Sequence, residues 1–423
     1  MTSTITRILT KPALIWFISA LFYLYENLLQ GSQSIIVPEL MRDFSLTAQS
    51  LSTKLGTSFL IAYSLSQIIV GVLLDKYSTK ILLTTAVSMC AIATYIYANT
   101  QNIEYAMISR IFIGIGASFA ALSSFKVSSN WFEHKQFSLL TGLLLSIGML
   151  GAFSSAPLLY MVTKYGWRIS FEYISYVGAI LAVITFIFIK DNPKKQSEHR
   201  KKTFKNIASE IKKIIVDPQV WIIALYGLLM FAPFLVLSNL WGPTILNKFY
   251  NLSREASANV FSLVFIGFII GAPLFGWFSN YINKRKTPLF ISSIGNGITI
   301  ILLIYYPVQN IVYISSLVFL LGFFTSAFLP SFSIMKEISR PNITSTSLGF
   351  MNTLNTIGGA TFMHFSGVIL DYLWQNNFEH GIRAYSISNY QTAFAIMPIL
   401  YIAALSLLYK VQETNCKCIH TDS

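Results

Sequence analysis

Long apolar stretches separated by short polar segments dominate the chain. Each stretch has about 20 residues, the length that an α-helix needs to cross ~30 Å of hydrocarbon. The longest polar segment, residues 190–217, is shorter than the ~40 residues below which a domain usually needs metals or disulfides. We therefore predict an all-α polytopic membrane protein without a soluble catalytic domain. Its twelve transmembrane helices are expected at residues 13–37, 55–74, 81–99, 105–129, 138–162, 171–189, 219–243, 256–278, 288–306, 312–335, 346–370 and 391–409.

The second half of the chain repeats features of the first half. Two sets of segments recur at offsets of 205 and 207 residues: Gly71–Asp75 with Gly276–Asn280, and the pair Gly142 and Gly151 with Gly349 and Gly358. Internal repeats of this kind are typical of transporters. We predict two pseudo-symmetric six-helix bundles, at residues 1–189 and 218–423 with a short cytoplasmic tail, joined by a basic cytoplasmic linker at 190–217.

The linker contains apolar residues at helical spacing. Phe204, Ile207 and Ile211 fall on one face of a helix, whereas Lys205 and Lys212 fall on the other. This pattern predicts an amphipathic helix lying on the membrane surface. A flexible charged tether is the alternative, because the pattern is short.

Composition excludes a soluble protein, and the charge distribution predicts the orientation. Only 11% of the residues are charged, against roughly 25% in soluble domains. Of the 30 Lys and Arg residues, 22 lie in one alternating set of loops together with both termini, so the positive-inside rule places both termini in the cytoplasm. A basic face toward anionic lipid explains the net charge of +13 without nucleic acid. Heavy use of Ile, Lys, Asn and Phe suggests a bacterial inner membrane, and we expect a monomer.

Two motifs resemble those of the major facilitator superfamily. Gly71-Val-Leu-Leu-Asp75-Lys76-Tyr-Ser-Thr-Lys80 is similar to the family's loop 2-3 motif, although a serine replaces its second glycine and a threonine one basic residue. Arg110-x-x-x-Gly-x-Gly is similar to its fourth-helix motif. The resemblance implies a secondary carrier in which two bundles rock about a central site. The antiporter motif of the fifth helix is not matched, because Ala156 precedes Pro157.

Further segments resemble a narrower group, the phagosomal transporter family of intracellular bacteria and the related lysosomal dipeptide uniporters. The group often has an arginine where this chain has Gln30 and an acidic residue where it has Asn239. The segments that carry the resemblance are Tyr23-Leu-Tyr-Glu26, Glu39-Leu-Met-Arg-Asp-Phe44, Trp131-Phe132, Gly166-Trp-Arg168, Leu240-Trp-Gly242 and Leu348-Gly-Phe-Met-Asn352.

Two charged residues within predicted spans are the main candidates for the transport chemistry. Glu26 lies near the middle of the first span, where an ionised carboxylate costs about 2.5 to 3.5 kcal/mol on insertion scales. We predict that it binds the coupling proton or a substrate amino group; the alternative is a carboxylate satisfied by neighbouring Tyr and Asn side chains. Arg110 cannot shuttle a proton, so it either contacts substrate or has a paired structural role.

Polar residues of the first, seventh and eleventh spans complete the predicted pocket. The sequence Trp241-Gly-Pro is expected to break the seventh helix near its outer end. Any of these residues could instead hold helices together. His364 is more consistent with packing, and no second metal ligand stands at helical spacing from it. Besides Glu26 and Arg110, the pocket residues are Tyr23, Asn27, Gln30, Tyr226, Asn239 and Trp241, with Asn352, Asn355 and His364 as secondary members.

The loop after the second span is expected to act as a gate together with its lysines, Lys76 and Lys80. The Asp75 carboxylate can accept backbone N–H groups at the positive N-terminus of the eleventh span, around residues 344–347. This contact would close the cytoplasmic side. Asn280 replaces the acid in the second half, so its contact with the fifth span should be weaker.

The chain therefore predicts a secondary transporter, not an enzyme, that moves a small polar organic solute. An amino acid or short peptide is the first expectation, with proton coupling; the alternatives are a uniporter, or a nucleoside or organic-anion carrier. An intramembrane enzyme would need a nucleophile with a base, or clustered ligands, but Glu26, Arg110 and His364 lie on three different spans. No cofactor is expected.

Overall fold

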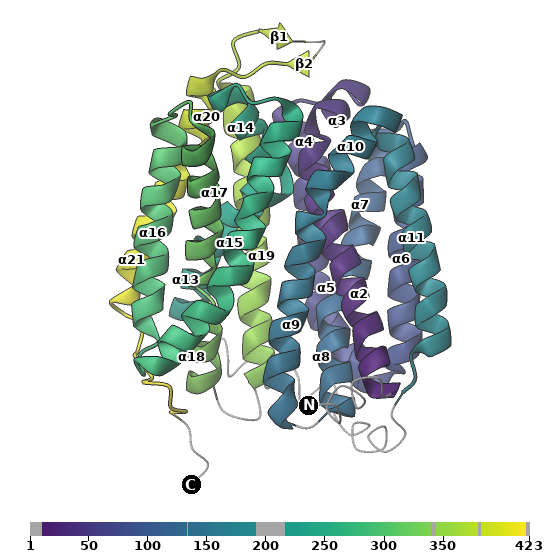
Figure 1. Ribbon diagram of the computed structural model, residues 1–423, viewed down its shortest axis with the longest axis vertical. Helices are drawn as coiled ribbons and strands as arrows, with labels where there is room; N and C mark the ends of the chain where they lie inside the picture. The colour runs from purple at the N-terminus through teal and green to yellow at the C-terminus, as the bar shows by residue number, and fades with distance from the viewer. Residues whose placement is uncertain (1–10, 133, 192–215, 340–343, 380–381, 420–423) are drawn as a thin grey trace.

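The computed structural model describes residues 11–132, 134–191, 216–339, 344–379 and 382–419. Figure 1 shows two groups of near-parallel helices side by side, α2 to α11 in one group and α13 to α21 in the other. Within the described residues, ten helical segments are long and apolar enough to cross a membrane by length and composition. With α5 and α19 beside them, they confirm the predicted all-α fold of two six-helix bundles. The predicted linker helix at residues 204–215 lies outside the described residues.

Several spans of the first bundle consist of two or more helical segments. The second span extends back to Ala48 and includes a π-helical segment, and the fourth span is divided into two helices at Ser118. Its elements are α2 (Lys11–Gly31), η1 (Ser32–Ile35), α3 (Val37–Asp43), α4 (Ala48–Leu51), η2 (Ser52–Thr57), α5 (Ser58–Lys76), α6 (Thr79–Asn99), α7 (Ile103–Ala117), α8 (Phe119–Trp131), α9 (His134–Phe153), α10 (Ser155–Tyr165) and α11 (Trp167–Phe188).

The second bundle repeats this plan and adds a short hairpin. In β1 and β2, Phe378 pairs with Arg383 in an antiparallel register. The elements are α13 (Pro218–Val236), η4 (Leu237–Trp241), α14 (Gly242–Tyr250), α15 (Arg254–Tyr281), α16 (Lys286–Tyr305), α17 (Ile311–Ser326), α18 (Pro330–Ile338), α19 (Thr344–Tyr372), β1 (Phe378–Glu379), β2 (Ile382–Arg383), α20 (Ile387–Phe394) and α21 (Ile396–Leu408).

The predicted break at Trp241 is only partly correct. The seventh span widens into the π-helical segment η4 and then continues as α14, so that residues 218–250 form one long helical segment. Pro243 lies in the first turn of α14, where a backbone N–H is not needed for the helix. Proline therefore changes the helix type here without ending the span.

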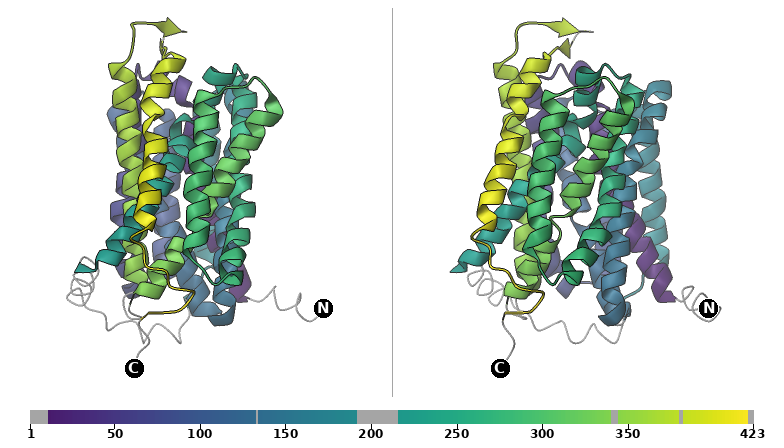
Figure 2. Two further views of the ribbon diagram at one scale, coloured as in Figure 1. Left: turned by 90° about the vertical axis from the view of Figure 1, so that its left-hand side faces the viewer. Right: turned by 60° about the vertical axis from the view of Figure 1, so that its left-hand side comes forward.

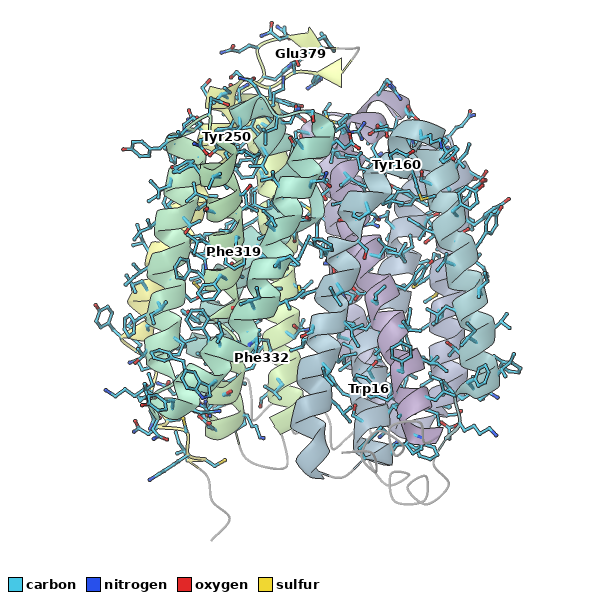
Figure 3. The ribbon with its side chains drawn as sticks, viewed as in Figure 1. Trp16, Tyr160, Tyr250, Phe319, Phe332 and Glu379 are labelled. Carbon is cyan, nitrogen blue, oxygen red and sulfur yellow. The ribbon has the colours of Figure 1, made fainter. Side chains whose placement is uncertain are left out.

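The two ends of the molecule differ. In both views of Figure 2 the hairpin stands at one end, called here the hairpin end, and both chain termini lie at the other. We call the latter the tail end, after residues 411–419. Figure 3 shows side chains pointing outward all around the helices, and α11 exposes Ile180, Val183 and Phe186 by more than half. This apolar surface is what a helix in contact with lipid requires.

Small residues allow the helices of the bundles to approach closely. A Cβ atom on Gly151 of α9 would lie 2.1 Å from the carbonyl oxygen of Leu24 in α2, and one on Gly367 of α19 would lie 2.6 Å from that of Ala48. The second of these contacts joins the two bundles. Across the centre of the molecule, α19 packs along α4, η2 and α5, while α9 packs against α15.

Candidate functional site

Glu26 lies in α2 inside the first bundle and is not directed toward lipid. Its side chain is 1% exposed, and its Oε2 accepts a hydrogen bond of 2.8 Å from Asn27 Nδ2, which also donates to the Tyr23 carbonyl. Tyr63 of α5 and Cys90 of α6 interact with it electrostatically. In the part of the chain that the structure describes, no lysine or arginine pairs with Glu26.

This environment is unusual for a carboxylate. An ionised group that is removed from water needs a counter-charge or several hydrogen bonds, and Glu26 has one amide donor. A protonated carboxyl group needs much less compensation. The arrangement is therefore suited to a group that gains and loses a proton as water reaches it.

A chain of polar side chains leads from Glu26 to the other bundle. Tyr63 of α5 lies within range of the charge of Glu26, and Gln67 follows one turn further along α5. Gln67 Oε1 accepts a hydrogen bond of 2.7 Å from Asn352 Nδ2 of α19. The sequence analysis included Asn352 but missed Tyr63 and Gln67; a glutamine within an apolar stretch was the available signal. Two residues of the first bundle, Tyr63 and Gln67, thus separate the proton candidate from Asn352 of the second bundle.

Arg110 is the second buried charge of the first bundle. It is 2% exposed, its Nε donates to the Leu55 carbonyl at 3.0 Å, and its guanidinium lies 4.5 Å from the ring centre of Phe59. Tyr97 of α6 is a second aromatic neighbour, at 6.0 Å. Among the described residues, no carboxylate is within ion-pair distance of Arg110. Within the described ranges, the contacts of the guanidinium are thus with aromatic rings and a backbone carbonyl.

The remaining predicted pocket residues do not form one cluster. Tyr226 donates to the Leu289 carbonyl at 2.9 Å within the second bundle, and Trp241 donates to Ser366 at 3.1 Å. His364 forms a hydrogen bond of 2.7 Å with Thr53 of η2, so it joins the two bundles. Gln30 is half-buried and, within the described ranges, makes no hydrogen bond.

Asn239 and Asn355 are buried with unpaired amide atoms. Asn239 Nδ2 has no partner among the described residues, and neither does Asn355 Nδ2 or Oδ1. Asn355 faces Gly227 of α13, where an added Cβ atom would lie 2.6 Å from Asn355 Oδ1. It therefore lies between two helices of the second bundle.

Contacts between the bundles close the hairpin end. The Asp371 carboxylate at the end of α19 accepts the backbone N–H groups of Ala48 (3.2 Å) and Gln49 (2.9 Å), the first residues of α4. Arg254 of the second bundle pairs with Glu39 and donates to the Ile35 carbonyl at 2.6 Å. Helix N-termini carry partial positive charge, so Asp371 stabilises this closure. The sequence analysis missed these contacts because they depend on how the bundles dock.

At the tail end, the described contacts of the predicted gate stay within each bundle. The Lys80 backbone N–H donates to Asp191 at 3.2 Å, and its ammonium lies 4.4 Å from the ring centre of Phe186. Asn280 accepts from Arg285 at 2.7 Å. The side chains of Asp75 and Lys76 lie outside the described part of the structure, so the gating role of Asp75 stays a prediction.

Comparisons with known proteins agree with this architecture. The family model described as Major Facilitator Superfamily matches residues 15–363 and 241–415. A solved bacterial homologue of the human lysosomal transporter Spinster, inward-facing and unoccupied, has a similar fold, with a TM-score of 0.78, 13% identity and coverage of 95% of this chain and 97% of that chain.

Two curated relatives are similar in sequence. The hexuronate transporter of Bacillus subtilis is 26% identical over 62% of this chain, and the match spans 63% of that relative, a little under two thirds of its length. The gentisate transporter of Corynebacterium glutamicum is 21% identical over 94% of this chain and 87% of its own length. The narrower resemblance to the phagosomal and dipeptide group gains no support from these relatives.

Proposed function

The chain belongs to the major facilitator superfamily, and from that premise we propose that it moves a small organic anion together with a proton by alternating access. The observation that carries the proposal is the buried Glu26 carboxyl with one amide partner. In this scheme Glu26 is protonated when the pathway opens to the proton-rich side. It releases the proton when the pathway opens to the other side.

The substrate class follows from Arg110 and from the relatives. A buried guanidinium without a carboxylate partner can pair with the carboxylate of a substrate. Hexuronate and gentisate, named for the two relatives, both carry a carboxylate. We therefore favour an organic anion, one of the alternatives from the sequence, over the amino acid or short peptide that was expected first, and we propose the sugar-acid class within it. A proton that moves with a monoanion also keeps the translocated charge neutral.

Uptake by the purified full-length chain in liposomes tests this proposal. With a proton gradient directed inward, the liposomes should accumulate labelled D-glucuronate above the level reached without a gradient. D-glucose, which lacks the carboxylate, and alanyl-alanine should not accumulate. Accumulation of the dipeptide without that of glucuronate would overturn the substrate class, and equal glucuronate uptake with and without the gradient would overturn the coupling.

The tail end is proposed to face the cytoplasm of a bacterial inner membrane, which the distribution of basic residues supports. Cys418 provides a native probe because it is exposed at the tail end, whereas Cys90 is buried. A membrane-impermeant maleimide should label Cys418 in opened cells and not in intact cells. Labelling in intact cells would reverse the orientation.

A further inference from the structure

Three irregular helical segments meet between the bundles near the hairpin end. The 3-10 segment η1 touches the π-helical segment η4, and η4 also touches the π-helical segment η2. Leu240 of η4 reaches within 3.8 Å of the Cβ position of Gly56 in η2. Single π-helical turns within α-helices occur frequently at functional sites.

Two of these segments carry a buried amide with unpaired atoms. Gln33 of η1 is 1% exposed, and neither its Nε2 nor its Oε1 has a partner among the described residues. Asn239 of η4 is 7% exposed and has an unpaired Nδ2. Buried polar groups are nearly always hydrogen-bonded, so unpaired amides on two segments that touch each other need an explanation.

The closure around these amides is one that has to open during transport. Ser34 and Ile35 follow Gln33 directly and line a small pocket at the hairpin end, together with Pro243, Thr244 and Arg254 of the second bundle. In the proposed alternating access the bundles separate at this end, so that η1 and η4 part and water or solute can reach the two segments that carry Gln33 and Asn239.

The free atoms define the chemistry of a suitable ligand. Gln33 offers two N–H donors and an acceptor, and Asn239 offers a further donor. A hydroxyl group both accepts and donates a hydrogen bond, so it can pair with the amide N–H groups and with the Gln33 carbonyl oxygen, whereas a carboxylate only accepts and would leave that oxygen unpaired. We propose that Gln33 and Asn239 form a subsite for the hydroxyl groups of the transported solute. This inference rests on the proposed function and specifies its substrate as a hydroxylated acid.

Replacement by leucine separates this role from a structural one. Leucine is close in size to both amides and removes the unpaired polar atoms, which is neutral or stabilising for the fold. Gln33→Leu and Asn239→Leu should each raise the KM for D-glucuronate at least tenfold in proteoliposomes, while the apparent Tm stays equal or rises. Asn296→Leu is the matched control, because Asn296 also has a buried unpaired Nδ2 but lies within α16 of the second bundle. Its KM should stay within twofold of the wild type.

Three results of these measurements would overturn the proposed subsite. A wild-type KM in both interface variants would overturn it and would assign the amides to internal structure or to bound water. An equal rise of KM in Asn296→Leu would overturn it as well, because the effect would then not depend on the interface. If the wild-type chain takes up no D-glucuronate, the proposed function fails and the subsite fails with it.

Discussion

The two bundles share a scaffold but differ in the chemistry of their cores. The first bundle encloses two charged groups, Glu26 and Arg110, which are almost completely buried and belong to no ion pair in the described part of the chain. The second bundle places its charged residues at its ends, and its described core holds neutral groups such as Asn296 and Tyr226. The two halves thus share their helices, whereas among the described residues the buried charged side chains outside ion pairs lie in the first half.

The features that the halves still share are structural. Asp191, which follows the last helix of the first bundle, accepts the backbone N–H of Lys80 at the start of α6. Glu413, which follows the last helix of the second bundle, accepts those of Arg285 (2.8 Å) and Lys286 (2.9 Å) at the start of α16. A carboxylate therefore caps the equivalent helix in both halves. The two halves therefore share this cap although their core chemistry differs.

The largest expected effect is a loss of stability when the buried ion pair of the second bundle is broken. Transport should not change. Arg285 and Glu337 form a buried pair at 2.7 Å, with side chains 11% and 9% exposed. Arg285→Gln leaves Glu337 buried without its cation, which should lower the free energy of unfolding by about 3 to 5 kcal/mol. Thermal denaturation in detergent measures this loss. The KM for D-glucuronate of the folded fraction should not change, and a large KM change would show that charge in this half also serves transport.

Replacement of Arg110 should instead impair transport and leave the stability of the protein nearly unchanged. Arg110→Gln removes a charge without stranding a buried carboxylate, so stability should change little. Loss of a charge-assisted hydrogen bond to the substrate costs about 1.5 to 3 kcal/mol, which corresponds to a rise in KM of about 10- to 150-fold. Uptake of D-glucuronate, with Arg285→Gln as the matched control, measures the difference. An unchanged KM with lower stability would make Arg110 a structural residue.

Replacement of Gln67 tests whether its hydrogen bond to Asn352 couples the two bundles during transport. Gln67→Leu removes the acceptor for Asn352, and one net hydrogen bond of about 0.5 to 1.5 kcal/mol predicts a fall in proton-driven uptake of up to about tenfold. The double variant Gln67→Leu with Asn352→Leu completes a mutant cycle. We expect it to be no worse than the more impaired single variant, and strictly additive losses would show that the two side chains act independently.

The smallest expected effect is the loss of stability when the carboxylate cap of the second bundle, Glu413, is replaced. Burial opposes ionisation of Glu413, but the backbone N–H groups of Arg285, Lys286, Asn415 and Thr414 outweigh it and hold the pKa of this carboxyl below its ordinary value. Its stabilisation is therefore fully present above the unfolded-state pKa and is lost as the pH falls through the folded-state pKa. Glu413→Gln should cost less than about 1 kcal/mol at neutral pH and should reduce the loss of stability on acidification. Unfolding curves at several acidic pH values measure this, and identical acid profiles would contradict it.

The sequence predicted the features that depend on local pattern. Apolar stretches of membrane length gave the helices, and an acidic residue in the middle of such a stretch identified Glu26. The π-helical segment η2 could not be predicted, because its residues have no distinctive pattern. At η4 the sequence Trp241-Gly-Pro predicted an interruption, but not that the span would continue beyond it. Tyr226 was placed in the pocket by symmetry, but its hydroxyl binds within the second bundle. Gln33 was missed because a polar side chain at the end of a span is usually exposed to water, and its burial is visible only in the structure.

Proton movement driven by the substrate tests the central claim most directly. Liposomes that contain the purified chain and an internal pH dye receive a D-glucuronate gradient and no initial pH difference. The account predicts that the wild-type interior acidifies as glucuronate enters, whereas Glu26→Gln exchanges labelled for unlabelled glucuronate without any acidification. Acidification by the Glu26→Gln variant at the wild-type rate would contradict the account.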